Sequence, residues 1–556
     1  MKKIVLLFLF CILSVQLFSQ VSTVWEKRYN GPGNSYDEAT SIYVDGAGNV
    51  YVAGASTGSG SGKDFAVVKY NSEGLTQWVG RYNGPGNGDD DAYTVKVDNA
   101  GNVYVSGTST GSGTGFDYCV VKYNSSGVQQ WAARYNGPGN ATDEVYSIQI
   151  DNAGNVYITG YSNGGASGDD MCTIKYNSTG AEQWVKRYNG SANNDDYGNS
   201  IAIDNSGNSY VTGAVTRTGS DLDYITIKYD ANGTQIWAVF YNGPGNAEDF
   251  PSSNAIDASG NIYVTGYSDG SGTLRDYCTV KYNNAGAQQW VQRYDGPDGW
   301  DEAWNIILDP AGNVYITGNS AGIGTGDDYC TIKYNSSGVQ QWVARYTGPD
   351  SSNDYCNWVA PDANGNVYVT GIVGDGTGNP QNIVTIGYNA AGVQQWVQTY
   401  NGTGNEFDSG NALTVDNQGN VYVTGGSDNL GNTDFITFKY SSTIGIEPIS
   451  TEIPQKYSLE QNYPNPFNPS TKIRFQIPLS RGVSEGQLVT PGREGVFTSL
   501  VIYDLSGKQV SSIVNEDLNP GTYEIDFNAS GLSTGTYFYR LTANNFTETK
   551  KMVLIK

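Results

Sequence analysis

The sequence NAGNVYVSGTSTGSGTGFDYCVVKYNSSGVQQWAARYNGPGN (residues 99–140) is one copy of a unit that fills most of this chain. Its tryptophan, Trp131, recurs along the chain at intervals of 52 to 54 residues. The members of this series are Trp25, Trp78, Trp131, Trp184, Trp237, Trp290, Trp342 and Trp396. A fixed period of this size is typical of a solenoid, a propeller or another repeat array.

Each unit has the pattern of short β-strands. In the second unit, alternating polarity predicts four strands at Tyr93–Asp98, Val103–Ser109, Asp117–Asn124 and Val128–Tyr135. The strands are joined by turns in which Asp or Asn is followed by Gly, as hairpins require. Antiparallel order places the two longer and more variable connections, from strand two to three and from strand four to the next unit, at the same end of the sheet.

Four-stranded units repeated around an axis form a β-propeller, in which ring closure protects the strand edges. The repeat region begins with an isolated fourth-type strand, Val24–Tyr29, and its last unit stops after a third strand, Asp434–Tyr440. The first strand can therefore complete the last sheet. We predict an all-β fold with an eight-bladed propeller over residues 21–440, closed by its N-terminal strand.

Two motifs of the repeat, GNVYVTG and DYxTIKYNxxGxQQW, resemble the bacterial β-propeller repeat family called SBBP. The resemblance covers about residues 24–440. It implies the fold and an exported protein, and it implies no activity, since fold alone does not specify function.

The N-terminus has the pattern of a secretory signal peptide over residues 1–20. Lys2 and Lys3 precede an apolar run, Ile4–Leu13, which is too short to span a membrane. Five cysteines remain after removal of this segment, and four of them occupy the same position in different units. Because each of these four would lie in its own sheet, we expect the cysteines to be free and buried.

A different module follows the repeats. After a linker at residues 441–457, residues 458–556 contain predicted strands at Lys472–Ile477, Ser499–Asp504, Gly521–Asn528, Gly535–Ala543 and Thr547–Ile555, which indicate a small β-sandwich. The segments NYPNPFNPST, LVIYDLSGKQV, LNPGTYEIDFNASGLSTGTYFYRL and KKMVLIK closely resemble the type A C-terminal sorting domain of the type IX secretion system of Bacteroidetes. The resemblance implies transport by that machinery and release or surface attachment. Residues 479–497 depart from the family as a polar insertion, expected to be an exposed loop.

The charge is concentrated in the repeats. Residues 21–445 contain 44 acidic and 19 basic side chains, whereas residues 446–556 contain 11 and 10. An acidic propeller repels nucleic acid and anionic membranes, so we expect neither as a partner. We expect a monomer with no transmembrane segment.

Two sets of recurring acids could bind cations. An Asp-x-x-Gly-Asn turn recurs in every unit, but a single carboxylate per turn favours a structural role over calcium. A second acidic position lies twelve residues after each tryptophan and is expected just before the innermost strand, so that it could form a ring at one mouth of the channel. These residues are Asp37, Asp90, Asp143, Asp196, Asp249, Glu302, Asp354 and Asp408. Such a ring could hold Ca²⁺, or each carboxylate could accept backbone N–H bonds where its loop joins the strand.

No catalytic constellation is evident in the sequence. The chain has no histidine, which excludes a Ser-His-Asp arrangement, and equivalent acids in every unit do not single out a glycosidase pair. The repeated tryptophans are expected to pack between sheets. We predict no cofactor apart from possible Ca²⁺, and an exported, non-enzymatic binding or scaffold module for an unknown glycan or protein; the alternative is an extracellular quinoprotein-like or carbohydrate-active enzyme.

Overall fold

The computed structural model describes residues 21–219, 221–349, 351–374, 381–404, 406–441, 448–450, 453–479, 496–529 and 532–555. The predicted signal peptide and most of the predicted insertion at 479–497 lie outside these residues. The described residues contain β-strands and no α-helix, so none of them forms a helix that could cross a membrane. By its contacts the chain divides into a unit at Ser22–Ser442 and a second unit that includes residues 443–556.

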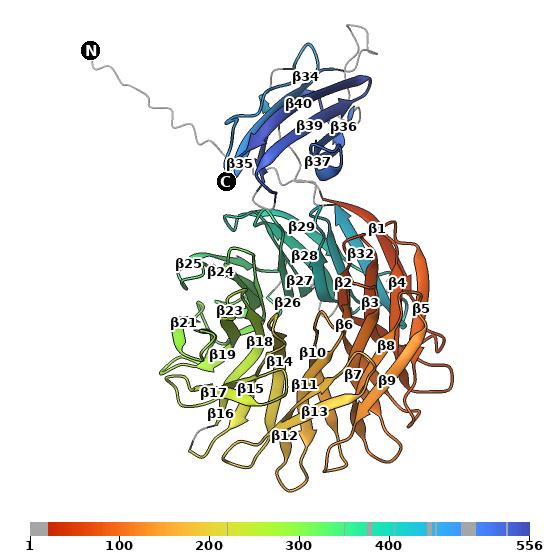
Figure 1. The fold of residues 1–556 in the computed structure, drawn as a ribbon, viewed down its shortest axis with the longest axis vertical. Coiled ribbons are helices and arrows are strands. Elements are labelled where there is room, and N and C mark those ends of the chain that lie inside the picture. The colour runs from red at the N-terminus through yellow and green to blue at the C-terminus, as the bar shows by residue number, and fades with distance from the viewer. Residues whose placement is uncertain are drawn as a thin grey trace, which may run out of the picture. The chain divides into compact units, whose positions relative to one another are not determined.

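The described part of the first unit forms eight four-stranded antiparallel sheets, numbered here 1 to 8 in chain order (Figure 1). The first strands are β2 (Asp37–Val44), β6 (Asp90–Val97), β10 (Asp143–Ile150), β14 (Asp196–Ile203), β18 (Asp249–Ile256), β22 (Asp301–Leu308), β26 (Tyr355–Pro361) and β30 (Asp408–Val415). The second strands are β3 (Val50–Thr57), β7 (Val103–Thr110), β11 (Val156–Asn163), β15 (Ser209–Thr216), β19 (Ile262–Asp269), β23 (Val314–Gly322), β27 (Val367–Gly374) and β31 (Val421–Asp428).

The remaining strands follow the same order. The third strands are β4 (Lys63–Tyr70), β8 (Phe116–Tyr123), β12 (Asp169–Tyr176), β16 (Leu222–Tyr229), β20 (Arg275–Tyr282), β24 (Gly326–Tyr334), β28 (Gln381–Tyr388) and β32 (Thr433–Ser441). The fourth strands are β5 (Thr76–Tyr82), β9 (Gln129–Tyr135), β13 (Glu182–Tyr188), β17 (Gln235–Tyr241), β21 (Gln288–Tyr294), β25 (Gln340–Tyr346) and β29 (Gln394–Tyr400), with β1 (Ser22–Tyr29) in the last sheet.

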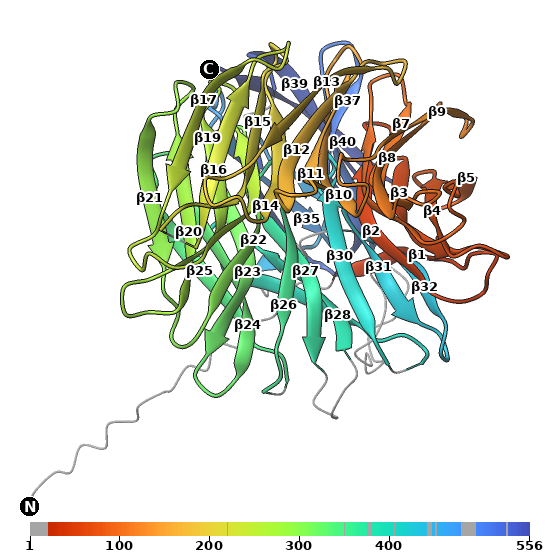
Figure 2. The same cartoon turned by 90° about the horizontal axis from the view of Figure 1, so that it is seen from below.

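The sheets form a closed ring around the first strands (Figure 2). Each first strand contacts the first strands of both neighbouring sheets, and β30 of sheet 8 contacts β2 of sheet 1. β1 pairs antiparallel with β32 along its length, with Arg28 opposite Ile436. The predicted all-β propeller, with the N-terminal strand closing the last sheet, is therefore confirmed.

The predicted first strand of the repeat began too late. In the second unit it begins at Asp90, three residues before the predicted Tyr93. A bulge between Ala92 and Thr94 breaks the alternation of polarity, so the alternating pattern is recognisable only after the bulge.

The hydrophobic core lies between neighbouring sheets. One cluster joins Tyr51 and Phe65 of sheet 1 to Val95, Val105 and Cys119 of sheet 2, all of them buried. Each sheet therefore buries one face against the sheet before it and the other against the sheet after it. Burial of this kind contributes about 25 cal/mol per Å² of apolar surface and is the main stabilising term of the ring.

The repeated tryptophans join adjacent sheets, as predicted. Trp78 of sheet 1 donates its indole N–H to the carbonyl of Ser125 in sheet 2, at 3.1 Å, and its ring contacts Tyr123 with 6.2 Å between centroids. The turn that meets the indole contains Gly127, whose φ is +81° and whose added Cβ would lie 2.5 Å from the ring. The glycine thus serves the turn and also lets it lie flat on the tryptophan of the preceding sheet.

The Asp-x-x-Gly-Asn turns are structural. The Asp98 carboxylate accepts backbone N–H bonds from Ala100 and Asn102, at 3.0 and 2.8 Å, and hydrogen bonds from the Asn102 amide and the Tyr104 hydroxyl. With four donors around one carboxylate, the turn needs no cation.

The C-terminal unit is a sandwich of two four-stranded sheets. One contains β33 (Pro448–Ser450), β38 (Gly521–Asn528), β35 (Ser470–Ile477) and β34 (Ser458–Leu459), and the other contains β37 (Gln509–Leu518), β36 (Val496–Tyr503), β39 (Gly535–Ala543) and β40 (Phe546–Leu554). Buried side chains from both sheets, among them Phe475, Tyr523, Leu500 and Tyr539, form one core.

Three strands of this unit, β33, β34 and β37, were not predicted. The predicted linker at 441–457 contains β33, which pairs antiparallel with β38. The strand β37 was not predicted, because the apolar residues of its sequence QVSSIVNEDL do not alternate with polar ones. It pairs with β36 across a hairpin in which the Asp504 carboxylate accepts the backbone N–H groups of Ser506 and Lys508.

The contact between turn glycine and tryptophan can be tested with two matched substitutions. Gly127→Ala and Gly113→Ala both place a side chain at positive φ, but an added Cβ at Gly113 meets no atom within 4 Å. We expect Gly113→Ala to lower the free energy of unfolding by about 1 kcal/mol, from backbone strain alone. Gly127→Ala should cost about 2–4 kcal/mol, because overpacking adds to that strain. Thermal melting and urea unfolding measure both, and equal losses would contradict the packing role.

Candidate functional site

The recurring acidic residues lie at the first strands of the propeller and are fully buried. Asp37 begins β2, and its carboxylate accepts the backbone N–H of Gly31 at 2.6 Å and of Thr57 at 3.0 Å. Asp90 and Asp143 make the same pair of bonds in the next two sheets. We call these residues the ring carboxylates; the structure places them at Asp37, Asp90, Asp143, Asp196, Asp249, Asp301, Asp354 and Asp408, each with 0% exposure.

This set differs from the predicted ring at one position. In sheet 6 the buried ring carboxylate is Asp301, not Glu302. The connection before β22 is one residue shorter than its counterparts: Asp301 accepts the N–H of Gly296, five residues earlier, whereas Asp249 accepts the N–H of Gly243, six residues earlier. The residue twelve positions after Trp290 is therefore Glu302, the neighbour of the buried Asp301.

The ring carboxylates are engaged by the backbone and do not converge on one ion. Among the described residues, no three of them bring carboxylate oxygens within 4.8 Å of one another. Burial, together with the nearby Asp170, Asp223 and Asp276 carboxylates of the preceding sheets, raises the pKa of Asp196, Asp249 and Asp301 to about 6, against hydrogen bonds that lower it. This geometry supports the structural alternative for the ring.

Arginines of the fourth strands are also part of the framework. The Arg134 guanidinium donates to the Asp117 carboxylate at 2.8 Å and to the carbonyl of Ser109 at 2.7 Å. Equivalent ion pairs join Arg81 to Asp64, Arg187 to Asp170, Arg293 to Asp276 and Arg345 to Asp328. Each pair lies within one sheet, between its third and fourth strands.

The five cysteines are free and buried, as predicted. Burial raises the pKa of Cys119, Cys172, Cys278, Cys330 and Cys356 to about 12. Since the thiolate is the reactive form, these groups do not serve as nucleophiles at neutral pH.

One end of the ring carries the longer connections, which join the second strand to the third within each sheet and the fourth strand to the next sheet. We call this end the loop face. Its acids near the second unit are held by local contacts: Asp89 accepts the N–H of Lys63 at 2.9 Å, and Asp91 pairs with the Lys63 ammonium at 3.0 Å. These charges are therefore partly compensated.

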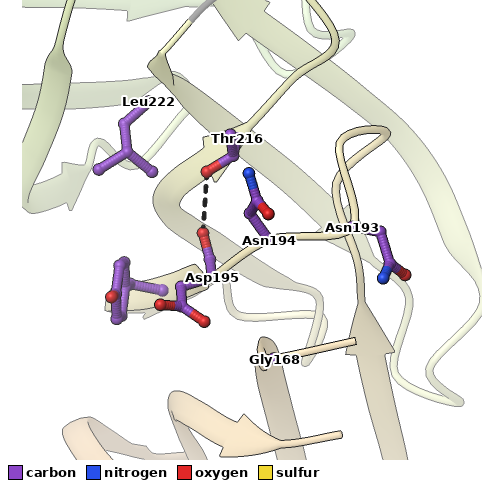
Figure 3. Close-up of a pocket in the computed structure, with 7 residues that line it drawn as sticks. Gly168, Asn193, Asn194, Asp195, Thr216 and Leu222 are labelled. Atoms are coloured by element: carbon purple, nitrogen blue, oxygen red, sulfur yellow. Dashed lines mark hydrogen bonds between the residues drawn. The ribbon is translucent and has the colours of Figure 1, made fainter. Parts of the chain in front are cut away.

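A shallow polar hollow of about 400 Å³ lies on the loop face between sheets 3 and 4 (Figure 3). Asp195 is fixed at its rim, since its carboxylate accepts the backbone N–H of Asp169 at 3.0 Å and its carbonyl accepts the Thr216 hydroxyl at 3.1 Å. The hollow is lined by Gly168, Asn193, Asn194, Asp195, Tyr197, Thr216 and Leu222.

Sequence reasoning missed the aromatic residues of this face. Tyr197 follows a ring carboxylate directly and contacts Tyr161 of sheet 3 and Phe250 of sheet 5, with centroid distances of 5.6 and 6.4 Å. The available signal was that the residue after the ring carboxylate differs from unit to unit, while the carboxylate itself recurs.

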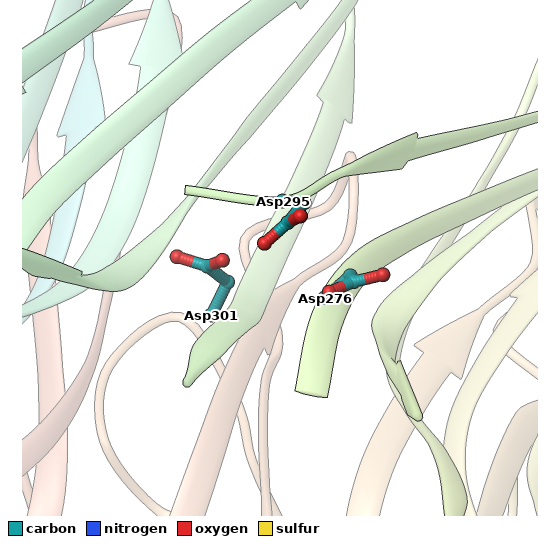
Figure 4. A group of neighbouring side chains, drawn as sticks. All are labelled: Asp276, Asp295 and Asp301. Carbon is teal, nitrogen blue, oxygen red and sulfur yellow. The ribbon is translucent and has the colours of Figure 1, made fainter. Parts of the chain in front are cut away.

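One cluster of acids could hold a metal ion. Asp276, Asp295 and Asp301 bring one carboxylate oxygen each within 4.8 Å of the others (Figure 4). Asp295 occupies a position that is asparagine in the five preceding units, at Asn30, Asn83, Asn136, Asn189 and Asn242. Because Arg293 already pairs with Asp276, the cluster carries a net charge of about −2, which a divalent cation would neutralise.

Comparison with known families identifies both parts of the chain. Residues 24–60, 130–165 and 183–214 match the SBBP family, described as a beta-propeller repeat. Residues 461–556 match the Por_Secre_tail family, described as a secretion system C-terminal sorting domain. The chain carries SBBP repeats and a type IX sorting domain.

Solved structures with related architecture are distant. A structure of PorZ, described as an essential bacterial surface component of the type-IX secretion system of Porphyromonas gingivalis, is 12% identical with a TM-score of 0.31, and the match covers 93% of this chain and 74% of PorZ. The β-propeller domain of a trilobed protease from Pyrococcus furiosus, described as having an open velcro topology, is 8% identical with a TM-score of 0.38, and covers 63% and 92%. A search of curated proteins gave no match.

The buried ring carboxylates of the SBBP propeller predict an unusual pH dependence of stability. Asp196, Asp249 and Asp301 have a pKa of about 6 in the folded protein and an ordinary value of 3.8. The folded state thus binds protons more tightly, and the melting temperature should rise as pH falls from about 7 to about 5. Below about pH 4 the turn carboxylates Asp45 and Asp257, whose pKa is lowered by hydrogen bonds, lose their contribution and stability falls.

Asp196→Asn should reduce this rise in melting temperature between pH 7.5 and pH 5. Asp195→Asn removes the same charge from the adjacent exposed position and should leave more of the rise intact. A melting temperature that falls steadily from pH 7.5 to pH 5 in the wild type would contradict the assignment.

Calcium binding is tested best at the Asp276, Asp295 and Asp301 cluster. Asp295→Asn restores the residue of the sibling units, so the fold should tolerate it. In EDTA we expect a higher melting temperature for Asp295→Asn than for the wild type, because one of three neighbouring like charges is removed. Millimolar Ca²⁺ should stabilise the wild type more than the variant. The same response of both proteins to Ca²⁺ would exclude a site at this cluster.

Proposed function

We propose that the mature protein is an exported, non-enzymatic propeller that acts as a binding or scaffold module at the cell surface or in the medium. The sorting domain supports secretion or surface attachment through the type IX machinery. The ligand would be a glycan or a protein, bound on the loop face, where the longer connections gather.

One observation carries the binding role: the position after each ring carboxylate varies while the carboxylate is constant. The side chains at this position are Glu38, Asp91, Glu144, Tyr197, Phe250, Glu302, Tyr355 and Ser409. If packing within the module determined this residue, the same residue would be expected in every unit. Variation on one face of an otherwise regular ring is what a surface adapted to an asymmetric ligand requires.

The engagement of the polar groups supports binding over catalysis. The ring carboxylates accept backbone N–H bonds, the thiols are protonated at neutral pH, and Glu248 and Glu302 both pair with Arg275. A glycosidase needs one acid that donates a proton and a second carboxylate that is free to act as base or nucleophile. The asymmetry of the loop face fits an enzyme as well as a binder, but three of its carboxylates, Asp91, Glu248 and Glu302, are held in ion pairs.

Binding without turnover is the measurement that separates the two functions. We expect the mature full-length chain to bind isolated bacterial envelopes or their polysaccharide and to be recovered with its ligand unchanged. Reducing-end assays and mass spectrometry should detect no cleavage, and a dye-linked assay should detect no oxidation. Stoichiometric binding with product formation in either assay would establish an enzyme instead, and failure to bind any envelope fraction would contradict the binding role.

A further inference from the structure

We propose that a continuous row of aromatic side chains on the loop face binds a neutral oligosaccharide. This inference rests on the proposed binding function and assigns its site and ligand class. The row, called here the aromatic arc, consists of Tyr146, Tyr161, Tyr197, Phe250, Tyr267 and Trp300.

The members of the arc contact one another across sheets 3, 4 and 5. Ring centroids are separated by 5.8 Å between Tyr146 and Tyr161, 5.6 Å between Tyr161 and Tyr197, and 6.4 Å between Tyr197 and Phe250. Phe250 stacks on Tyr267 with 5.7 Å between centroids and an interplanar angle of 14°. Residues of three different repeats thus form one aromatic surface.

Arg275 extends the arc to sheet 6. Its guanidinium lies 4.2 Å from the centroid of Tyr267 and 4.6 Å from that of Trp300, so it is held between the two rings. Glu248 accepts from the guanidinium at 2.9 Å and from the Tyr267 hydroxyl at 2.7 Å, and Glu302 accepts from the other guanidinium nitrogen. These contacts fix Trp300 before any ligand binds, which lowers the entropic cost of binding.

The propeller itself does not require the arc. The position of Tyr161 and Tyr267 on the second strands is occupied in the other sheets by Ala55, Thr108, Ala214, Asn319, Ile372 and Gly426. Those sheets have the same topology and the same buried core without an aromatic ring there. An aromatic residue at this position is therefore not required for closure of the ring.

The arc presents aromatic surface to solvent. Trp300 is 50% exposed and Tyr146 is 39% exposed, while Tyr161, Tyr197 and Phe250 are half-buried. Tyr267 is buried at 6% exposure and supports the neighbouring rings from below the surface. Contiguous apolar surface that is rimmed by polar groups marks an interaction site. Aromatic side chains offer large apolar faces, and the C–H face of a puckered pyranose ring can pack against such a face.

Polar groups next to the arc suit hydroxyl donors. Tyr197 also lines the hollow of Figure 3, where Asn193, Asn194 and Asp195 offer amide and carboxylate groups. Asp195 is already positioned by its bond to the N–H of Asp169, at 3.0 Å. A few placed polar groups beside aromatic surface are the usual composition of a small-molecule site.

The local charge selects a neutral ligand. Glu144 lies within 3.4 Å of the Tyr146 hydroxyl, and Asp195, Glu248 and Glu302 follow along the arc. The one cation among them, Arg275, is shared by two carboxylates and is not available to an anion. Uronic acids and sulfated sugars would be repelled, whereas the hydroxyls of a neutral sugar can donate to these acceptors.

The test uses the full mature chain and defined probes. Binding of neutral hexasaccharides of glucose, mannose, xylose and arabinose is measured by calorimetry, with hexagalacturonate as the anionic probe and hexalysine as the cationic one. We expect at least one neutral probe to bind and hexagalacturonate not to bind. Trp300→Ala and Tyr197→Ala should each weaken that affinity about five- to tenfold.

Tyr355→Ala is the matched control, since Tyr355 occupies the position of Tyr197 in sheet 7, outside the arc. It should leave the affinity unchanged, and melting temperatures report whether any variant is misfolded. Tyr197→Phe keeps the ring and should retain binding.

Three results would overturn the proposal: no neutral probe binds, the arc variants bind as the wild type does, or hexalysine binds in an arc-dependent manner instead. These results leave the proposed function separately measurable. If the wild type and the arc variants bind envelopes equally well, the protein is a binding module whose ligand-binding site lies outside the aromatic arc.

Discussion

Ring closure is the constraint on which the rest of the propeller depends. Every sheet buries both of its faces against neighbours, and only a closed ring supplies two neighbours to each sheet. The closing strand β1 is secured from several directions: the Trp25 indole donates to the carbonyl of Ser72 in sheet 1 at 3.2 Å, and Arg28 donates to Ser427 and Tyr400, both at 2.7 Å. A strand from the start of the chain thus makes the same contacts as the fourth strands that follow within each repeat.

The ion pairs between the third and fourth strands also depend on both partners being present. In sheet 4 the position of the paired arginine is Phe240, yet Asp223 keeps a cation because Arg217 reaches it at 3.0 Å. In sheet 7 both members change, to Asn382 and Thr399, so neither charge of the pair is present. Removing one member of a buried ion pair is costly, whereas removing both is tolerated. Such paired changes indicate that the recurring acids and arginines are coupled to each other and to the fold, and are not a supply of catalytic groups.

Much of the fold could be predicted from the sequence because the same signals recur in each unit. The tryptophans, the Asp-x-x-Gly-Asn turns and the alternating strands repeat. A strand or turn that is indistinct in one unit can therefore be located from the equivalent residues of the others. The errors lie where a local irregularity shifts the count: the bulge at Ala92 and Thr94 hides the start of the first strand, and the shortened connection before Asp301 moves the acid by one residue. In the C-terminal domain, β37 was missed because its apolar residues do not alternate with polar ones, and β33 because it lies within a segment assigned as a linker.

The candidate site was less predictable than the fold, for a physical reason. Tyr161, Tyr197 and Phe250 are 36 and 53 residues apart in sequence, and each occupies a strand position that can be aromatic or not without disturbing its own sheet. Only the packing of neighbouring sheets makes them a single surface.

The repeat architecture makes such a surface easy to build. Each unit projects the residue after its ring carboxylate at the same place on the loop face, so successive units provide successive positions along the ring. Changing that residue alters the face while the ring carboxylate beneath it, the sheet and the tryptophan contact remain. A ligand that is itself a chain of similar units matches this arrangement better than a compact one, because consecutive sheets then meet consecutive units of the ligand.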